Sequence, residues 1–204
     1  MAKGRKIETQ NIDPARIFAS ADEYYELDRF INNLGENFKP QFAMPGVVVS
    51  ALALELYFKC LILLNGKTYD GIHYLDELFE CLDGPLKKMI REDWNAHQLQ
   101  ETRSMILKMY NQFKEMNKTG DQAVYDRIID HPEKIDFDWC LKSSSKAFAA
   151  FRYEYEPRKP GEPAPAWYGG GMLTVARNAI LKIKPEWKSA SRGWIYTPST
   201  SPTQ

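Results

Sequence analysis

Two residues of the segment REDWNAH, Arg91 and His97, combine side chains that could act together on a phosphate. An arginine can neutralise phosphate charge and a histidine can transfer a proton, which supports attack by a ribose 2′-hydroxyl without a metal ion. On one helix, a spacing of six residues points the two side chains about 120° apart, so only two copies across a dimer axis could combine them. The other interpretation, which we favour, packs His97 in the core on the stripe of Leu86 and Ile90.

A second group of candidate residues surrounds Glu55 and Lys59, which are four positions apart inside the apolar run from Val47 to Leu64. On a helix the two side chains lie within about 40° of each other, with glutamate in the favoured N-terminal position. We favour a structural pair at the edge of the core. A binding or catalytic role for Glu55 requires a partner such as His73 or Arg152 to converge on it.

His73 follows Asp70 by three positions and opens a predicted helix, where an imidazole can cap backbone groups or pack its ring against the previous helix. We favour capping as the simpler role. Arg152 and Tyr153 lie in AFAAFRYEYE, where Arg152 can pair with Glu156 or, beside tyrosine, stack on a nucleobase.

The chain contains no motif for a metal ion or a phosphate-binding loop. No histidine or cysteine pair has metal-ligand spacing, and Gly169 to Gly171 lack the Lys-Ser/Thr ending of a P-loop. We therefore expect no metal and no cofactor.

Composition predicts a globular protein of one domain, because 44% of the 204 residues are hydrophobic and 26% are charged. The 27 basic and 27 acidic residues cancel, which argues against nonspecific coating of nucleic acid but allows a local basic pocket. Cys60, Cys81 and Cys140 are odd in number and lie beside apolar residues, as reduced core cysteines do. The start MAKGRKIETQ has no apolar segment of a secretory signal, so we expect a cytoplasmic protein.

Apolar residues recur at helical spacing along most of the chain, and no segment alternates with a period of two. The predicted helices are 13–34, 44–64, 72–82, 86–94, 98–117, 122–130, 137–156 and 173–183. The first should bury a stripe formed by Ile17, Ala21, Tyr24, Leu27, Ile31 and Leu34. The second is long enough to cross a membrane, but Glu55 at its centre favours the central helix of a soluble bundle. The sequence thus predicts an all-α protein, an irregular up-and-down helical bundle.

We expect a single helical domain over residues 1–187, with its core at about 12–184 and a Pro/Gly-rich loop at 157–171. Residues 188–204 form a Ser/Thr/Pro-rich tail. That loop and the aromatic part of the tail also permit a structural role, in which the protein binds a protein partner.

The central segment resembles the HEPN superfamily (higher eukaryotes and prokaryotes nucleotide-binding). The likeness is carried by Ser50-Ala51, Glu55-Leu56, Lys59-Cys60-Leu61, Gly66, His73-Tyr74-Leu75 and Leu78, and further on by the segment from Phe151 to Glu156. Together these matches span about residues 50–156, roughly half of the chain.

The resemblance implies an up-and-down bundle, frequently a homodimer, in small bacterial proteins associated with RNA or nucleotides. Some members are metal-independent ribonucleases of toxin–antitoxin and anti-phage systems, with an arginine followed after four to six residues by a histidine. Here no histidine follows Arg152 at that distance, while Arg91 and His97 have that spacing. The leading expectation is a binding module using Glu55, Lys59, His73, Arg152 and Tyr153. The rival is an endoribonuclease using Arg91 and His97.

Overall fold

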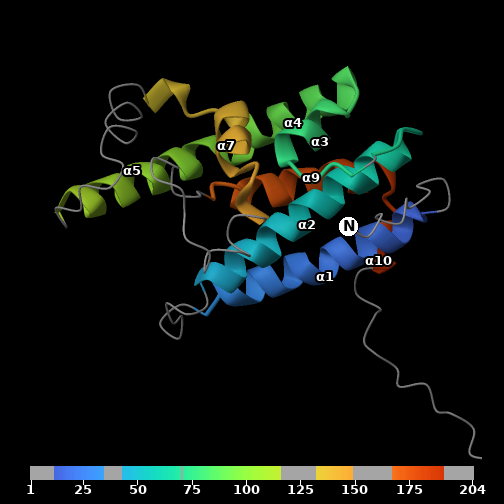
Figure 1. Cartoon of the computed structure of the whole chain (residues 1–204), viewed down its shortest axis with the longest axis horizontal. Coiled ribbons are helices and arrows are strands. Elements are labelled where there is room, and N and C mark those ends of the chain that lie inside the picture. Colours follow the sequence, from blue (N-terminus) through green and yellow to red (C-terminus); the bar gives the residue numbers. More distant parts are fainter. Residues whose placement is uncertain (1–11, 35–42, 70, 116–131, 149–166, 191–204) are drawn as a thin grey trace, which may run out of the picture.

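The computed structural model describes residues 12–34, 43–69, 71–115, 132–148 and 167–190, and every regular element among them is helical (Figure 1). The prediction of an all-α helical bundle is therefore confirmed. In chain order the elements are α1 (Pro14–Asn32), α2 (Ala43–Leu64), α3 (Leu75–Glu80), α4 (Gly84–His97), α5 (Leu99–Glu115), the 3-10 turn η4 (Pro132–Lys134), α7 (Phe137–Ser144), α9 (Gly170–Ile183) and α10 (Trp187–Ala190).

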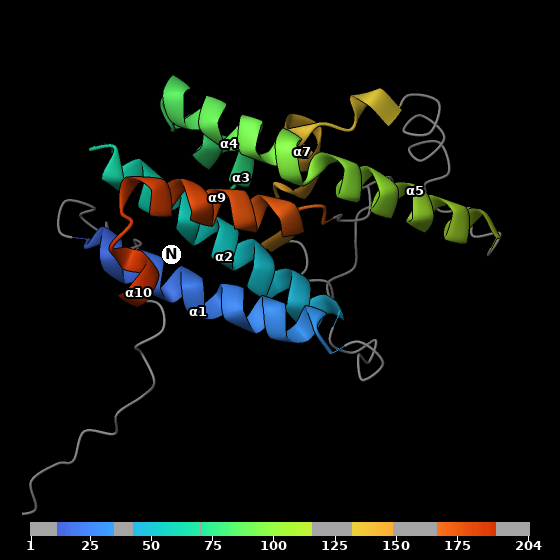
Figure 2. The ribbon, with the colours of Figure 1, turned by 180° about the vertical axis from the view of Figure 1, so that it is seen from behind.

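Helix α2 forms the centre of the core, and it lies between α1 and α9 in both Figure 1 and Figure 2. Its side chains Leu54, Tyr57 and Phe58 are fully buried. By length and composition alone α2 could span a membrane, but 56% of its most apolar window is buried inside the protein. Together with the buried charges of Glu55 and Lys59, this packing is that of a core helix in a soluble bundle, as the sequence predicted.

Helix α1 begins as expected, but the set of residues that it buries differs from the predicted stripe. The Asp13 side chain accepts a hydrogen bond from the Ala15 amide at 2.9 Å, and Pro14 occupies the first turn. The predicted stripe is wrong at Leu27, which is 43% exposed, whereas Ile17 and Ala21 are buried as predicted. Asp22 and Asp28 are buried although the stripe did not include them. Asp22 and Asp28 bind side chains of other helices, and these contacts compensate for burying the two carboxylates in place of an apolar residue.

The Asp22 carboxylate of α1 binds side chains of two other helices. The Tyr57 hydroxyl of α2 donates to Asp22 at 2.6 Å, and Arg177 of α9 donates two hydrogen bonds of 2.9 Å to its two oxygens. The Arg177 guanidinium also lies 5.4 Å from the Tyr25 ring centroid. This network joins α1, α2 and α9 at positions far apart in the sequence.

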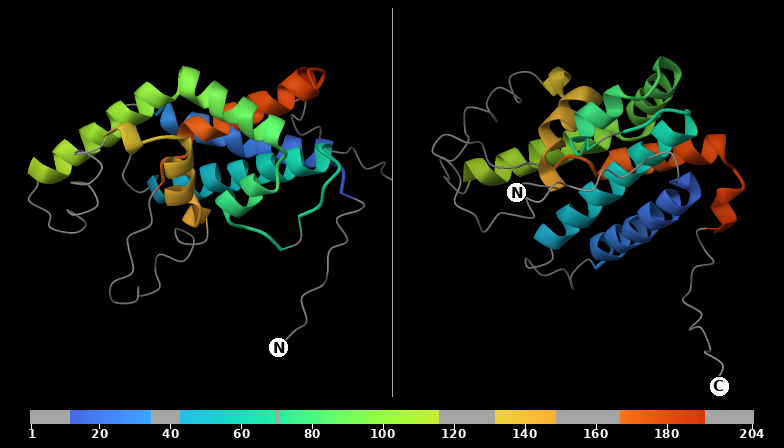
Figure 3. Two further views of the ribbon diagram at one scale, coloured as in Figure 1. Left: turned by 90° about the horizontal axis from the view of Figure 1, so that it is seen from above. Right: turned by 45° about the vertical axis from the view of Figure 1, so that its right-hand side comes forward.

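Helix α3 packs on α2, α4 packs on α9, and α7 packs on α3 and α4. The Asp83 side chain caps α4 through the Leu86 amide at 2.8 Å, and Asp136 caps α7 through the Trp139 amide at 2.7 Å. Phe79 and Phe137 meet at 5.0 Å between ring centroids and connect α3 to α7. Helix α5 follows α4 after Gln98 and extends away from the rest of the bundle (Figure 3).

Several predicted boundaries differ from the structure. The helix expected at 137–156 is interrupted after Ser144, because Ser144 and Ser145 hydrogen-bond to the Tyr168 amide and to Asp76 instead of continuing the helix. Helix α9 begins at Gly170, inside the loop predicted at 157–171. The short helix predicted at 122–130 lies outside the described residues.

Candidate functional site

The Glu55 carboxylate is the centre of a polar cluster on α2. Its Oε1 atom accepts a hydrogen bond of 2.6 Å from Lys59 Nζ and lies 2.9 Å from His73 Nδ1. The Glu55 side chain is only 4% exposed, whereas the His73 side chain is 63% exposed. Because an ionised carboxylate can only accept, Nδ1 of His73 is the donor and Nε2 is the ring nitrogen left for another partner. The convergence of His73 on Glu55, which a binding or catalytic role of Glu55 requires, is thus observed.

His73 reaches Glu55 from the connection between α2 and α3, not from a helix. Gly66 and Gly71 adopt φ angles of 68° and 64°, a left-handed conformation that favours glycine and lets this segment turn back along α2. Tyr74 is the N-cap residue of α3 and makes no side-chain cap. The prediction that His73 opens the helix as a cap is therefore wrong, since its ring binds a side chain of α2.

One aromatic ring contacts Lys59 of this cluster, and a second, which follows His73 in the chain, contacts Lys146. The ammonium of Lys59 lies 5.0 Å from the Tyr69 ring centroid, and the ammonium of Lys146 lies 5.6 Å from that of Tyr74. Tyr74 is 41% exposed, and Lys146 is also exposed. Lys146 is brought here by Ser145, whose hydroxyl donates to Asp76 and whose carbonyl accepts from the Leu75 amide at 3.3 Å. We call Tyr69, His73, Tyr74 and Lys146, with Glu55 and Lys59 beneath them, the His73 patch.

The second oxygen of Glu55 has no hydrogen-bond partner among the described residues, although it is buried. A buried carboxylate oxygen is a strong acceptor, and leaving it unpaired costs free energy. Burial, together with Cys60 and Glu55, raises the pKa of the neighbouring Tyr69 hydroxyl. Tyr69 therefore stays protonated at neutral pH and keeps a hydrogen-bond donor on the patch.

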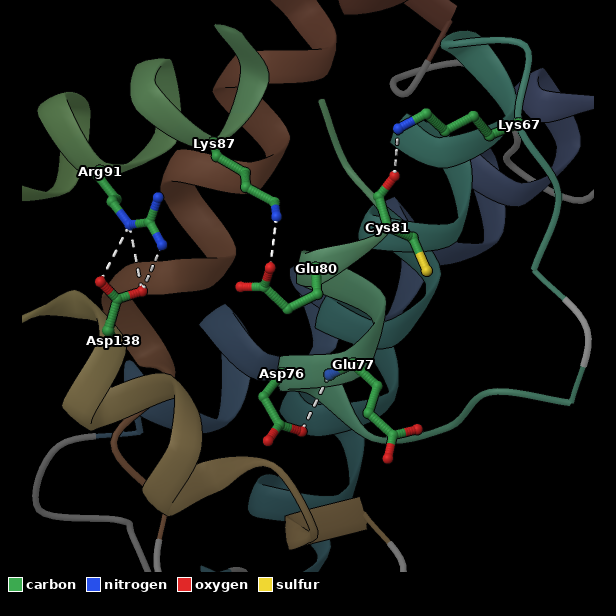
Figure 4. A network of polar contacts seen from close by, with 8 residues as sticks. All are labelled: Lys67, Asp76, Glu77, Glu80, Cys81, Lys87, Arg91 and Asp138. Carbon is green, nitrogen blue, oxygen red and sulfur yellow. Dashed lines mark hydrogen bonds and ion pairs between the residues drawn. The ribbon is translucent and has the colours of Figure 1, made fainter. Parts of the chain in front are cut away.

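Arg91 is held by an aspartate of α7 (Figure 4). Its Nε and Nη2 atoms donate to Asp138 at 3.1 and 2.8 Å, and its guanidinium lies 5.0 Å from the Phe79 ring centroid. This bidentate geometry fixes the orientation of the side chain. Arg91 thus joins α4 to α7, and its guanidinium already pairs with a carboxylate.

The neighbouring polar contacts in Figure 4 are also structural. Lys87 Nζ lies 2.6 Å from a Glu80 carboxylate oxygen, which pairs α4 with α3. Lys67 Nζ donates to the Cys81 carbonyl at 2.8 Å, which fastens the connection after α2 to the end of α3.

His97 lies on the surface, so the favoured prediction of a core-packed histidine is wrong. Its side chain is 68% exposed, and its Nδ1 atom lies 2.7 Å from Asp93 Oδ1. The buried stripe of α4 ends one turn earlier at Trp94, and the aspartate four residues before His97 holds the imidazole along the helix surface. Lys182 of α9 lies 3.6 Å from the other oxygen of Asp93. Within one chain, Arg91 and His97 are therefore committed to different aspartates.

Several residues of these clusters were missed from the sequence. Asp93 and Asp138 pair with the predicted site residues His97 and Arg91, and Lys182 pairs with Asp93. Only Asp93 has a sequence signal, its spacing of four residues before His97. Arg152 and Tyr153, both predicted to bind, lie outside the described residues. The described residues contain no group of three or more His, Cys, Asp or Glu side chains that could hold a metal ion.

A scan of the chain against protein-family models gave no match, and searches of curated proteins and of solved structures gave none either.

Proposed function

We propose that this protein is a HEPN-like, cytoplasmic helical module that binds single-stranded RNA or a nucleotide through the His73 patch. The observation that carries this proposal is the anchoring of an exposed imidazole on the buried Glu55 carboxylate, beside the exposed Tyr74 ring and Lys146. The resemblance of residues 50–156 to the HEPN superfamily supports it independently.

The chemistry of the patch suits unpaired nucleotides. Nucleobases stack on aromatic rings, and each stacked base contributes about 1–3 kcal/mol to binding. The exposed ring of Tyr74 offers such a face, and the ammonium of Lys146 beside it can neutralise a backbone phosphate. Since the whole chain has zero net charge, binding must rely on this kind of local arrangement.

Fluorescence anisotropy with a labelled, mixed-sequence RNA oligonucleotide tests the proposal. We expect Tyr74→Ala to weaken binding about tenfold, as loss of one stacked base would. Glu55→Gln should weaken binding less, because it loosens His73 without removing the ring. Met105→Ala is the matched control, since Met105 is 43% exposed on α5 and lies outside the patch. Equal affinity of wild type and Tyr74→Ala for the RNA would contradict binding through the His73 patch. A wild-type protein that does not bind the RNA would contradict the proposed function.

A second candidate function is a metal-independent endoribonuclease of toxin or anti-phage type. The observation that favours it is the orientation of the exposed His97 by Asp93, which prepares a histidine for proton transfer. Arg91 would have to leave Asp138 or be supplied by a second copy. Incubation of the protein with RNA in EDTA tests this candidate. Cleavage that disappears in His97→Ala and persists in His73→Ala supports it, whereas cleavage unchanged by His97→Ala contradicts it.

The proposal includes a homodimer, in which a second copy covers the apolar side of α1. Leu27 and Phe30 are 43% and 64% exposed there, with Tyr24 and Ile31 half-buried beside them. An apolar face can meet its own copy across a two-fold axis without needing complementary charge. Light scattering after size exclusion should give a dimer for wild type and a monomer for Phe30→Glu. A monomeric wild type contradicts this part of the proposal.

A further inference from the structure

A groove of about 480 Å³ lies along the outer face of α4, with one side chain from α9 at its edge. Its lining combines apolar and charged side chains, and none of its residues belongs to the His73 patch. The lining residues are Pro85, Lys88, Met89, Glu92, Asp93, Ala96, His97 and Lys182. The volume falls in the range of about 300–1,000 Å³ that is usual for small-molecule sites.

Two polar groups of this groove contact one largely buried carboxylate. Asp93, whose side chain is 10% exposed, contacts His97 Nδ1 through Oδ1 and Lys182 Nζ through Oδ2. An ionised carboxylate accepts the Nδ1 proton, so the ring is fixed and Nε2 is left uncommitted to Asp93. Asp93 is therefore a positioning residue, which holds the imidazole and the ammonium on the same side of α4.

The remaining charged pair of the groove is weakly held. Lys88 and Glu92 are 3.8 Å apart, and their side chains are 75% and 67% exposed. A pair this exposed contributes little to stability and exchanges readily for a better partner. A ligand with two negative charges could therefore draw Lys88 away from Glu92 while Lys182 stays beside Asp93.

We propose that this groove is a binding site for a phosphomonoester, either that of a small phosphorylated molecule or the 5′-terminal phosphate of RNA. The phosphate oxygens accept hydrogen bonds from Lys182 and Lys88, His97 Nε2 lies on the same polar side of the groove, and Met89 and Pro85 support the apolar part of the ligand. This site is independent of the RNA-binding proposal above, because the two sites share no residue.

Isothermal titration in a phosphate-free buffer tests this site, with inorganic phosphate, a nucleoside 5′-monophosphate and RNA oligonucleotides with and without a 5′-phosphate as probes. We expect the monophosphate to bind to wild type, and Lys182→Ala to weaken its binding about tenfold, as loss of one charge-assisted hydrogen bond would. Lys108→Ala on α5 is the matched control for loss of one exposed positive charge.

The probes distinguish the two sources of the phosphate. A preference for 5′-phosphorylated over 5′-hydroxyl RNA that Lys182→Ala abolishes identifies an RNA terminus, and binding of the monophosphate alone identifies a small molecule.

Asp93→Asn should change the ¹⁵N shifts of the His97 imidazole and weaken binding. The site is overturned if no probe binds to wild type, or if Lys182→Ala and Lys108→Ala bind equally. A Tyr74→Ala variant that loses RNA but still binds the monophosphate separates this site from the His73 patch.

Discussion

Glu55 shows at the scale of one residue how a buried charge is stabilised here. It interacts with a cation from its own helix and with a histidine from the following connection, and both contacts use the same oxygen. The sequence predicted the pair with Lys59 from the spacing of four residues. It could not predict which role of His73 prevails, because the turn through Gly66 and Gly71 decides where the imidazole lies.

Removing only one member of the buried pair should be strongly destabilising. In Lys59→Met, Glu55 keeps only His73 as a partner, and we expect a loss of about 3 kcal/mol in the free energy of unfolding. The double variant Glu55→Leu with Lys59→Met should recover most of this loss, since no unpaired charge remains buried. Urea unfolding of the three proteins measures both effects. A double variant as unstable as the single one would contradict this account.

Asp28 should make stability depend on pH. Burial raises the pKa of its carboxyl above the ordinary value of 3.8, while hydrogen bonds from Ser50 and Asn32 act in the opposite direction. The folded state therefore binds this proton more tightly than the unfolded state does, so the contribution of Asp28 is full below 3.8 and is lost as pH rises through the raised pKa. Asp28→Asn, which cannot ionise, should gain stability relative to wild type from about pH 4 to pH 7. A constant difference in urea unfolding across this range would contradict the prediction.

The three cysteines should differ in reactivity toward a thiol reagent. Burial raises the pKa of the Cys60 thiol and of the Cys140 thiol to about 12, with Asp13 and Asp136 adding to it respectively. Both therefore stay protonated and inert at neutral pH, whereas Cys81 is only half-buried. Folded protein should release one equivalent of thionitrobenzoate from Ellman's reagent, and unfolded protein three. Cys81→Ser should react only after unfolding.

At the scale of elements, apolar periodicity predicted most helices, because it depends on neighbouring residues. Asp13, Asp83 and Asp136 all cap the helices expected after them. The same reasoning failed where a distant partner competes, as at Ser144, whose hydroxyl accepts from the Tyr168 amide. The buried face of α1 failed for the same reason, since Asp22 and Asp28 bind side chains of α2 and α9.

The contact between α4 and α7 gives a prediction at this scale. Arg91→Ala removes the bidentate pair with Asp138 and the contact with Phe79, and we expect a loss of about 1 kcal/mol, since both partners are partly exposed. Lys88→Ala is the control, because its pair with Glu92 spans one helix and fastens nothing else. Thermal unfolding compares the two variants. An equal, negligible effect of both would show that Arg91 does not hold the two helices together.

At the scale of the whole molecule, composition and the lack of period-two alternation were enough to predict an all-α bundle. The placement of the sites was not predictable, because it depends on contacts between residues far apart in the sequence. Lys146 reaches Tyr74 through a turn after α7, and Lys182 reaches Asp93 from α9. Neither contact could be predicted from the spacing of neighbouring residues in the sequence. Arg91 and His97 illustrate the converse, since a suggestive spacing joins two residues that belong to different contacts.

The carboxylate of Asp22 has a consequence for how the chain is made on the ribosome. Its cationic partner, Arg177, is synthesised 155 residues later, so α1 and α2 emerge with a charge that belongs in the interior but is not yet neutralised. Until α9 leaves the exit tunnel, the nascent helical pair must keep Asp22 in water and remain loosely packed. Completion of the core therefore waits for the last part of the chain, and truncated products that lack α9 should be recognised by chaperones or proteases as unfinished.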